Sequence, residues 1–122
     1  MPNNLGGFAY FEGRWDDAIG LYERGRDTRL RTGNAVMAAL ASCNIGEVLT
    51  DQGRLDEAET AFRDARRVFR AADYSYGVAT AAQHLGLVAT RAGDIEAAFT
   101  FLEDARAQFD AIGARATSKR WT

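Results

Sequence analysis

Hydrophobic and small residues recur along the chain at the spacing of helices that bury one face. Two stripes advance by 3, 4, 3, 4 and 3 positions, which is the pattern of an amphipathic helix. The first stripe comprises Leu55, Ala58, Phe62, Ala65, Phe69 and Ala72, and the second comprises Ile95, Ala98, Leu102, Ala105, Phe109 and Ile112. An earlier stripe begins with Trp15, Ala18 and Tyr22 but continues into Gly25 and Arg29. We therefore expect this earlier helix to pack less well near its end.

Each stripe is preceded by another helical segment, so the chain reads as a series of helix pairs. The preceding helices are predicted over 34–52 and 73–92. Turns within the pairs are predicted at Gly13, Gly53 and Gly93, where glycine can adopt the left-handed conformation that ends a helix. Turns between the pairs are predicted at Gly33, Asp73 and Gly113, and Asp94 stands where it can cap the next helix.

The pairs form a repeat of forty residues. When 34–73 is aligned with 74–113, thirteen of the forty positions are identical. Small residues recur at Gly46/Gly86 and Ala58/Ala98, where they allow two helices to approach while Phe62 or Leu102 fills the neighbouring gap. We predict one domain over 1–122, cut from a longer array. Its repeats are 1–33 (truncated), 34–73 and 74–113, and 114–122 begins a further helix or cap.

The residues that recur resemble the tetratricopeptide repeat. The pattern is carried by Asn44-Ile45-Gly46 through Leu49, by Gly53-Arg54-Leu55, and by Ala58, Phe62 and Ala65. This resemblance implies an all-α fold, a tetratricopeptide-like right-handed superhelix of antiparallel helix hairpins, or α-solenoid. The common repeat has about 34 residues. A period of forty is similar to the repeats of kinesin light chain and of bacterial multidomain signalling regulators of the adenylate/guanylate cyclase type.

The resemblance also implies a binding surface, because in this family the first helix of each pair lines the concave face where partners dock. Residues at equal phase then form rows across that face. Side-chain amides in such rows can hold the backbone of an extended peptide. An alternative stays open, in which Asn4 and Asn44 bridge neighbouring helices. The candidate ligand-binding residues are Asn4, Asn44, Glu47, Asp51, Gln83, His84, Leu87 and Arg91.

Other kinds of chemistry are disfavoured by the composition. The formal net charge of −2 argues against nucleic acid, although Arg63, Arg66, Arg67 and Arg70 form a basic strip that we interpret as a solvated outer face. No apolar run approaches the roughly 20 residues of a membrane span. One cysteine, Cys43, and one histidine, His84, supply neither a metal site nor a catalytic set. We expect no enzyme activity, no cofactor and no metal.

The function that the sequence favours is recognition of a protein or extended peptide, within a cytoplasmic bacterial signalling or regulatory protein. A carboxylate clamp of the chaperone-binding kind is excluded, because Thr80 and His84 stand where it needs cations. The alternative is a structural role, in which the segment oligomerises or spaces domains and has no open groove. Uncapped ends of the array would then support self-association, through the apolar face of Ile95, Leu102 and Phe109.

Overall fold

The computed structural model describes residues 14–121, and the side chains of residues 14–115. This part of the chain contains helices and turns without a strand, which confirms the all-α fold. None of its helices is both long enough and apolar enough to cross a membrane. The helices are α2 (Trp15–Arg31), α3 (Ala35–Asp51), α4 (Leu55–Ala71), α5 (Ser75–Ala92) and α6 (Ile95–Trp121).

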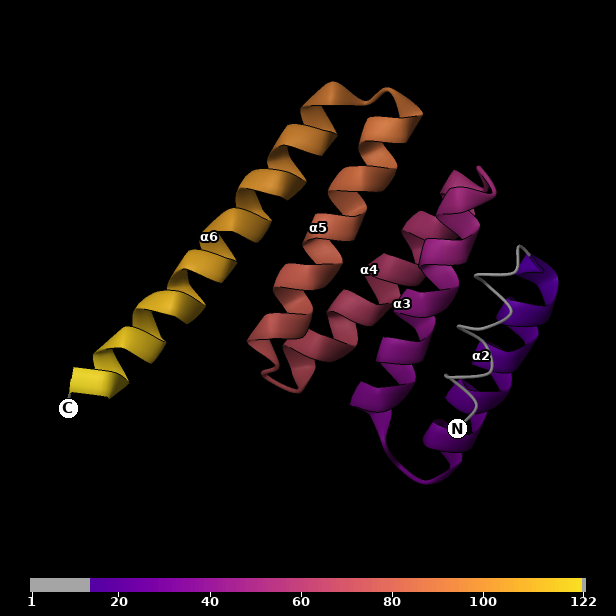
Figure 1. Ribbon diagram of the computed structural model, residues 1–122, viewed down its shortest axis with the longest axis horizontal. Helices are drawn as coiled ribbons and strands as arrows, with labels where there is room; N and C mark the ends of the chain where they lie inside the picture. The colour runs from indigo at the N-terminus through magenta and orange to yellow at the C-terminus, as the bar shows by residue number, and fades with distance from the viewer. Residues whose placement is uncertain (1–13, 122) are drawn as a thin grey trace.

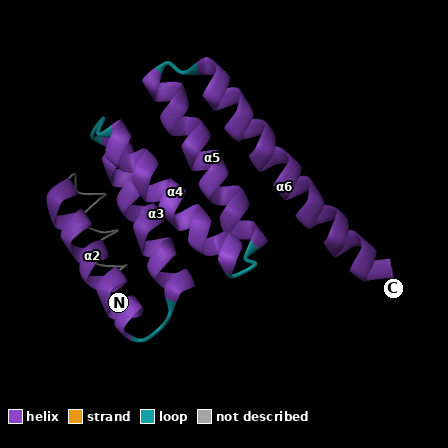
Figure 2. Cartoon of the chain, turned by 180° about the vertical axis from the view of Figure 1, so that it is seen from behind, coloured by secondary structure: helices purple, strands orange, loops and turns teal. Residues whose placement is uncertain are grey.

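The helices form a layered stack in chain order. Each packs against the next one along the chain, and α3 also contacts α5. Figure 1 shows α2 at one end of the stack and α6 at the other, and Figure 2 shows the short loops that join the helices. The second helices begin forty residues apart, at Trp15, Leu55 and Ile95. Two of the predicted pairs, α3 with α4 and α5 with α6, are therefore present in the described chain, and α2 stands at the position of the second helix of the first pair.

The turns predicted at Gly33, Gly53, Asp73 and Gly93 lie where the sequence places them. Gly53 and Gly93 take φ values of 79° and 81°, a region that a side chain disfavours. Asp73 adopts the same region with a φ of 58°. The carboxylate of Asp94 accepts a hydrogen bond from the backbone N–H of Ala97 at 3.1 Å, which confirms the predicted cap. Gly13 lies outside the described residues.

Close approach of helices depends on the small residues that the repeat preserves. A Cβ atom added to Gly46 would lie 2.7 Å from the Phe62 ring, and one added to Gly86 would lie 2.6 Å from Leu102. These are the two pairs that the sequence predicts. Gly77 extends the pattern between hairpins, since a Cβ there would lie 2.6 Å from Phe69. The absence of a side chain at these positions is what lets the large neighbour fill the space.

The core follows the predicted stripe of α4 most closely. In α4 the stripe residues Ala58, Phe62, Ala65 and Phe69 are all buried. In α2 burial stops at Gly25, and Leu30 is 56% exposed. The prediction that α2 packs less well near its end is confirmed.

One predicted turn is wrong. The sequence suggests a turn at Gly113 and a new element over 114–122, but α6 continues through Gly113 to Trp121. A turn in this architecture is stabilised by the next hairpin, which must pack back onto the preceding helix. No such hairpin follows α6 within the described residues, and Ala114, Arg115 and Ala116 directly after Gly113 are residues that favour continued helix.

Candidate functional site

A groove runs between α3 and α5, the first helices of two successive hairpins. It consists of two adjoining cavities. The larger, which we call the charged cavity, has a volume of about 370 Å³. It is lined by Glu47, Thr50, Asp51, His84, Leu87, Thr90 and Arg91. These described lining residues all come from α3 and α5.

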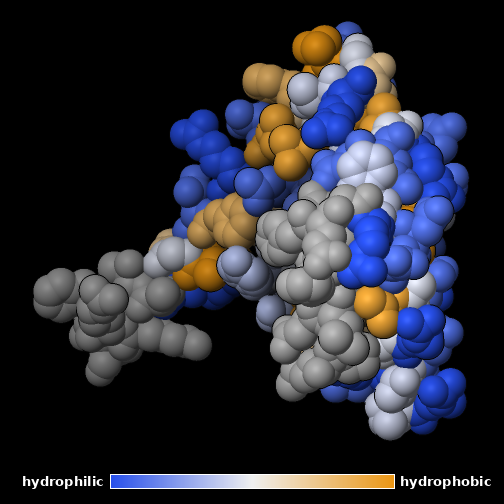
Figure 3. Space-filling view, turned by 45° about the vertical axis from the view of Figure 1, so that its right-hand side comes forward, coloured by the Kyte–Doolittle hydropathy of each residue, from blue (hydrophilic) through white to orange (hydrophobic). Residues whose placement is uncertain are grey.

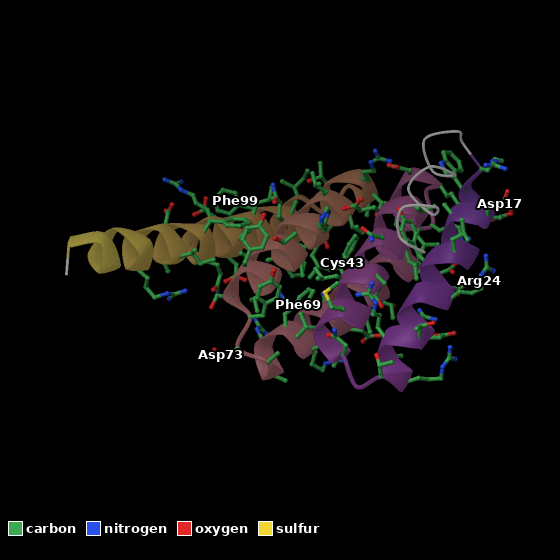
Figure 4. All side chains as sticks on the ribbon, turned by 60° about the horizontal axis from the view of Figure 1, so that its bottom comes forward. Asp17, Arg24, Cys43, Phe69, Asp73 and Phe99 are labelled. Atoms are coloured by element: carbon green, nitrogen blue, oxygen red, sulfur yellow. The ribbon has the colours of Figure 1, made fainter. Side chains whose placement is uncertain are left out.

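The smaller cavity has a volume of about 280 Å³, and we call it the apolar cavity. Its lining comprises Leu40, Cys43, Asn44, Glu47, Phe69, Tyr76, Gly77, Thr80 and His84. Figure 4 shows Cys43 and Phe69 between the helices, whereas Asp17 and Arg24 point outward from α2. Glu47 and His84 line both cavities and therefore mark the boundary between them.

His84 is held in place by contacts on two sides. Its ring stacks on Phe62 of α4, with 4.8 Å between ring centroids and 7° between ring planes. Its Nε2 atom lies 3.2 Å from Oε1 of Glu47 on α3. Stacking on a fully buried ring fixes the plane of the imidazole. The side chain of His84 therefore contacts both the groove, through Glu47, and the core, through Phe62.

Arg91 connects the two helices at the far end of the charged cavity. Its Nη1 donates a hydrogen bond to the carbonyl oxygen of Thr50 at 3.1 Å, and its Nη2 lies 3.7 Å from Oδ1 of Asp51. The hydroxyls of Thr50 and Thr90 donate to carbonyls of their own helices, those of Gly46 at 2.7 Å and Gly86 at 2.8 Å. The polar groups at this end are thus committed mainly to the protein itself.

The structure brings five of the predicted site residues together. The charged cavity contains Glu47, Asp51, His84, Leu87 and Arg91. Asn44 lines the apolar cavity and is half-buried, whereas Gln83 is exposed and lines neither cavity. Asn4 lies outside the described residues.

Sequence reasoning missed the residues that make the second cavity apolar. Leu40 lies one turn before Asn44 on α3. On α5, Thr80 lies one turn before His84 and Tyr76 lies two turns before it. The signal that could have found Leu40 and Thr80 is their equal phase in the forty-residue repeat. Phe69 comes from α4, and no repeat phase on α3 or α5 points to it.

Cys43 does not have the properties of a nucleophile. Burial, together with the smaller effect of the Glu47 charge, raises the pKa of its thiol to about 12. A thiol with such a pKa stays protonated at neutral pH, whereas the nucleophile is the thiolate. Within residues 14–121, no three side chains are placed to hold a metal ion. These features are those of a packed residue rather than a reactive one.

The arginine strip on α4 is engaged in contacts within the protein. Arg63 pairs with Glu59 at 3.0 Å, and Arg67 pairs with Asp64 at 3.0 Å. The guanidinium carbons of Arg63 and Arg66 also lie 5.3 and 5.5 Å from the centre of the Phe101 ring on α6. The strip therefore makes ion pairs within α4 and cation–π contacts between α4 and α6.

The visible described surface on the side that carries α2 is mixed in character. Figure 3 shows hydrophilic residues over much of this face, with hydrophobic ones scattered among them. Single exposed apolar residues of this kind are normal for a folded protein. Among the described residues, large apolar side chains are exposed on α2, α5 and α6, and the two most exposed lie on α6, where Ile95 is 71% exposed and Phe99 is 66% exposed.

Comparison with known proteins places this architecture. The crystal structure of BtubC (BKLC) from P. vanneervenii superposes with a TM-score of 0.84 at 19% sequence identity. The superposition covers 92% of this chain and 46% of that one, so the chain spans about half the length of this similar protein. No curated protein matched the sequence. The tetratricopeptide repeat model matches twice, over residues 1–71 and 36–111. Because these matches cover nearly the whole chain, the protein belongs to the tetratricopeptide repeat family, whose repeats generally mediate protein–protein interaction.

Proposed function

We propose that the chain is a binding module that holds a protein segment or extended peptide in the groove between α3 and α5. The observation that carries this proposal is the pair of adjoining cavities, which have different chemistry and a shared boundary at Glu47 and His84. Ligand sites are typically concave, largely apolar and supplied with a few placed polar groups. The groove combines these three properties.

Leu87 supports this role. It lies in the charged cavity, yet its side chain is 49% exposed. An apolar side chain that stays half in water inside a cavity gains free energy when a partner covers it, at roughly 25 cal/mol per Å² of area removed from water. Its neighbours on the same helix, Leu85 and Val88, already supply the core. Leu87 is therefore available for a partner without loss of core packing.

The surroundings of Asn44 support a role in ligand binding rather than the alternative role of bridging neighbouring helices. Within the described residues, its amide makes no hydrogen bond to another helix. An amide on a groove wall can donate to and accept from a peptide backbone. We therefore assign Asn44 to backbone contact, with Glu47, Asp51, His84, Leu87 and Arg91 completing the surface. Gln83, which is exposed beside the groove, would contact only a broader partner.

A bacterial, cytoplasmic signalling or regulatory protein is the setting that we propose for this module. The support is the resemblance of its forty-residue repeats to those of such regulators. The likeness to BtubC adds the fold and leaves the partner open. The test of the setting is identification of the parent protein and of the domains that accompany the module.

A structural role is the second candidate, and the exposed face of α6 favours it. Ile95 and Phe99 are more than 60% exposed, and Leu102 is 39% exposed. Contiguous exposed apolar surface marks places where proteins associate. Under this alternative the chain would associate through α6, and the groove between α3 and α5 would have no ligand.

A matched pair of variants separates the two roles. Leu87→Ser alters the groove and Phe99→Ser alters α6, and both replace an exposed apolar side chain by the same small polar one. Wild type and both variants serve as baits against lysate of the source organism, after circular dichroism has shown equal helicity. Binding lost with Leu87→Ser and kept with Phe99→Ser supports recognition in the groove. The reverse result contradicts it and favours association through α6.

A further inference from the structure

The groove has an uneven charge distribution that restricts what it can bind. Three side chains in the charged cavity carry formal charge when histidine is counted as neutral: Glu47, Asp51 and Arg91. Arg91 is engaged by Asp51 at 3.7 Å and by the carbonyl of Thr50 at 3.1 Å. The partner of Glu47 is the Nε2 atom of His84. Within the described residues, Glu47 is therefore the carboxylate of this cavity that pairs with no lysine or arginine.

The negative charge of Glu47 also affects the pKa values of neighbouring side chains. Burial raises the pKa of Cys43 and of Tyr22, and the nearby charge of Glu47 raises both further. Cys43 lies on α3 and Tyr22 on α2, so the field of Glu47 extends to two helices. A partly exposed carboxylate with such a field attracts a cation from solution or from a ligand. The side chain of Glu47 is 48% exposed, which leaves it accessible.

The apolar cavity lies next to this carboxylate along α3. On α3 the apolar cavity is lined by residues from Leu40 to Glu47, and the charged cavity by residues from Glu47 to Asp51. From Leu40, at the far end of the apolar cavity, to Glu47 is seven residues of helix, which is about 10 Å at 1.5 Å per residue. A polyproline II segment advances about 3.1 Å per residue and returns a side chain to the same side every third residue. Side chains three positions apart on such a ligand would therefore meet the two cavities.

We propose that the groove binds an extended peptide segment in which an apolar side chain and a lysine or arginine lie three positions apart. The apolar side chain enters the apolar cavity, the cation pairs with Glu47, and the stem of the cation packs on Leu87. This inference depends on the proposed function and specifies its ligand. An acidic segment is disfavoured, because it would bring its charge close to Glu47.

A selection from a random dodecapeptide display library tests the proposal on the full chain. Wild type and Leu87→Ser are immobilised separately, and the enriched sequences are compared. We expect wild type to enrich peptides with a basic and an apolar residue three positions apart. Enriched peptides that are acidic, or that lack the basic residue, contradict this inference and leave the proposed function standing. Equal or absent enrichment on the two proteins contradicts the proposed function itself.

A matched charge comparison then tests the role of Glu47. The most enriched peptide is labelled with fluorescein, and its binding is measured by fluorescence anisotropy. Glu47→Gln removes the charge from the groove, and Glu23→Gln removes the same charge from the exposed surface of α2. We expect about five-fold weaker binding for Glu47→Gln, as for a partly exposed ion pair, and less than about two-fold change for Glu23→Gln. Equal losses would show a general charge effect and overturn the assignment to Glu47.

Discussion

The helices α4 and α6 hold the same place in successive hairpins, but the apolar stripe of α4 is buried and that of α6 is partly exposed. Phe62 of α4 is 1% exposed, whereas Leu102, its counterpart forty residues later, is 39% exposed. The reason is the number of neighbours: α4 packs against α3 and α5, and α6 packs against α5. Figure 1 shows α6 at the edge of the stack with its last turns beyond α5. The same stripe therefore becomes core or surface according to what lies next to it, as expected for a repeat protein.

The two helices also differ at a position just outside the stripe. Where α4 has Glu59, which pairs with Arg63, α6 has Phe99. Figure 4 shows Phe99 on the open side of α6. In the interior hairpin this position meets a charged partner, and at the end of the stack it presents an aromatic ring to solvent. Substitutions at equivalent positions of α4 and α6 can therefore separate packing from exposure.

The largest difference is expected when the central stripe residue is truncated in each helix. Phe62→Ala removes a fully buried ring and should lower the free energy of unfolding by about 3–5 kcal/mol. Leu102→Ala removes a side chain that is already partly in water, and should cost about 1–2 kcal/mol. Urea unfolding followed by circular dichroism measures both. Equal costs would contradict the view that α6 contributes little to the core.

The glycines beneath these two side chains should also respond differently. Gly46→Ala places a Cβ 2.7 Å from the buried Phe62 ring, which cannot move away, and should cost about 1–3 kcal/mol. Gly86→Ala places a Cβ 2.6 Å from Leu102, but this side chain can rotate toward solvent. The loss at Gly86 should therefore be less than about 1 kcal/mol, because alanine also favours helix over glycine.

Gly20 of α2 is the control for that comparison. A Cβ there would meet only Nη1 of Arg24 at 3.7 Å, which is an ordinary contact. Gly20→Ala should therefore raise stability by about 0.5–1 kcal/mol from helix propensity alone. If all three substitutions shifted the urea midpoint alike, the glycines would not act through close helix packing.

Most of this architecture could be predicted because it depends on local spacing. The stripe of α4, the pairing of Gly46 with Phe62, and the cap at Asp94 each follow from residues one to sixteen positions apart. The wrong prediction at Gly113 has the same origin, since the repeat phase indicates a turn there. Whether a turn forms at that phase depends on a following hairpin, and this information is not local.

The groove was only partly predictable, because it depends on side chains from different helices. Repeat phase placed Glu47, Asp51, Leu87 and Arg91 near one another on α3 and α5. It could not show that Arg91 reaches the carbonyl of Thr50, forty-one positions away. Nor could it show that His84 stacks on Phe62, which depends on rotamers and on the placement of α4 beneath both helices.

Phe99→Glu tests whether the exposed face of α6 has a role of its own. The variant gives α6 the residue that α4 has at this position, Glu59. Because the Phe99 ring is 66% exposed, the free energy of unfolding should change by less than about 0.5 kcal/mol. If the chain self-associates through α6, the variant should be more monomeric in sedimentation velocity at high concentration. Unchanged association would place the contact elsewhere.

The smallest effects are expected at the equivalent positions 73 and 113, where the chain turns after α4 but continues as helix in α6. Asp73 has a φ of 58°, which disfavours a Cβ, so Asp73→Gly should raise stability by about 0.5 kcal/mol. Gly113 lies inside α6, and a Cβ added there meets no atom within 4 Å. Gly113→Ala should therefore strengthen the last turns of α6, by up to about 1 kcal/mol locally. Circular dichroism should show more helix for Gly113→Ala, with an unchanged urea midpoint. Asp73→Gly should raise the urea midpoint and leave the helix content unchanged.

If Gly113→Ala instead lowered the stability, glycine would be the better residue at both positions, and α6 would also turn at Gly113 in solution.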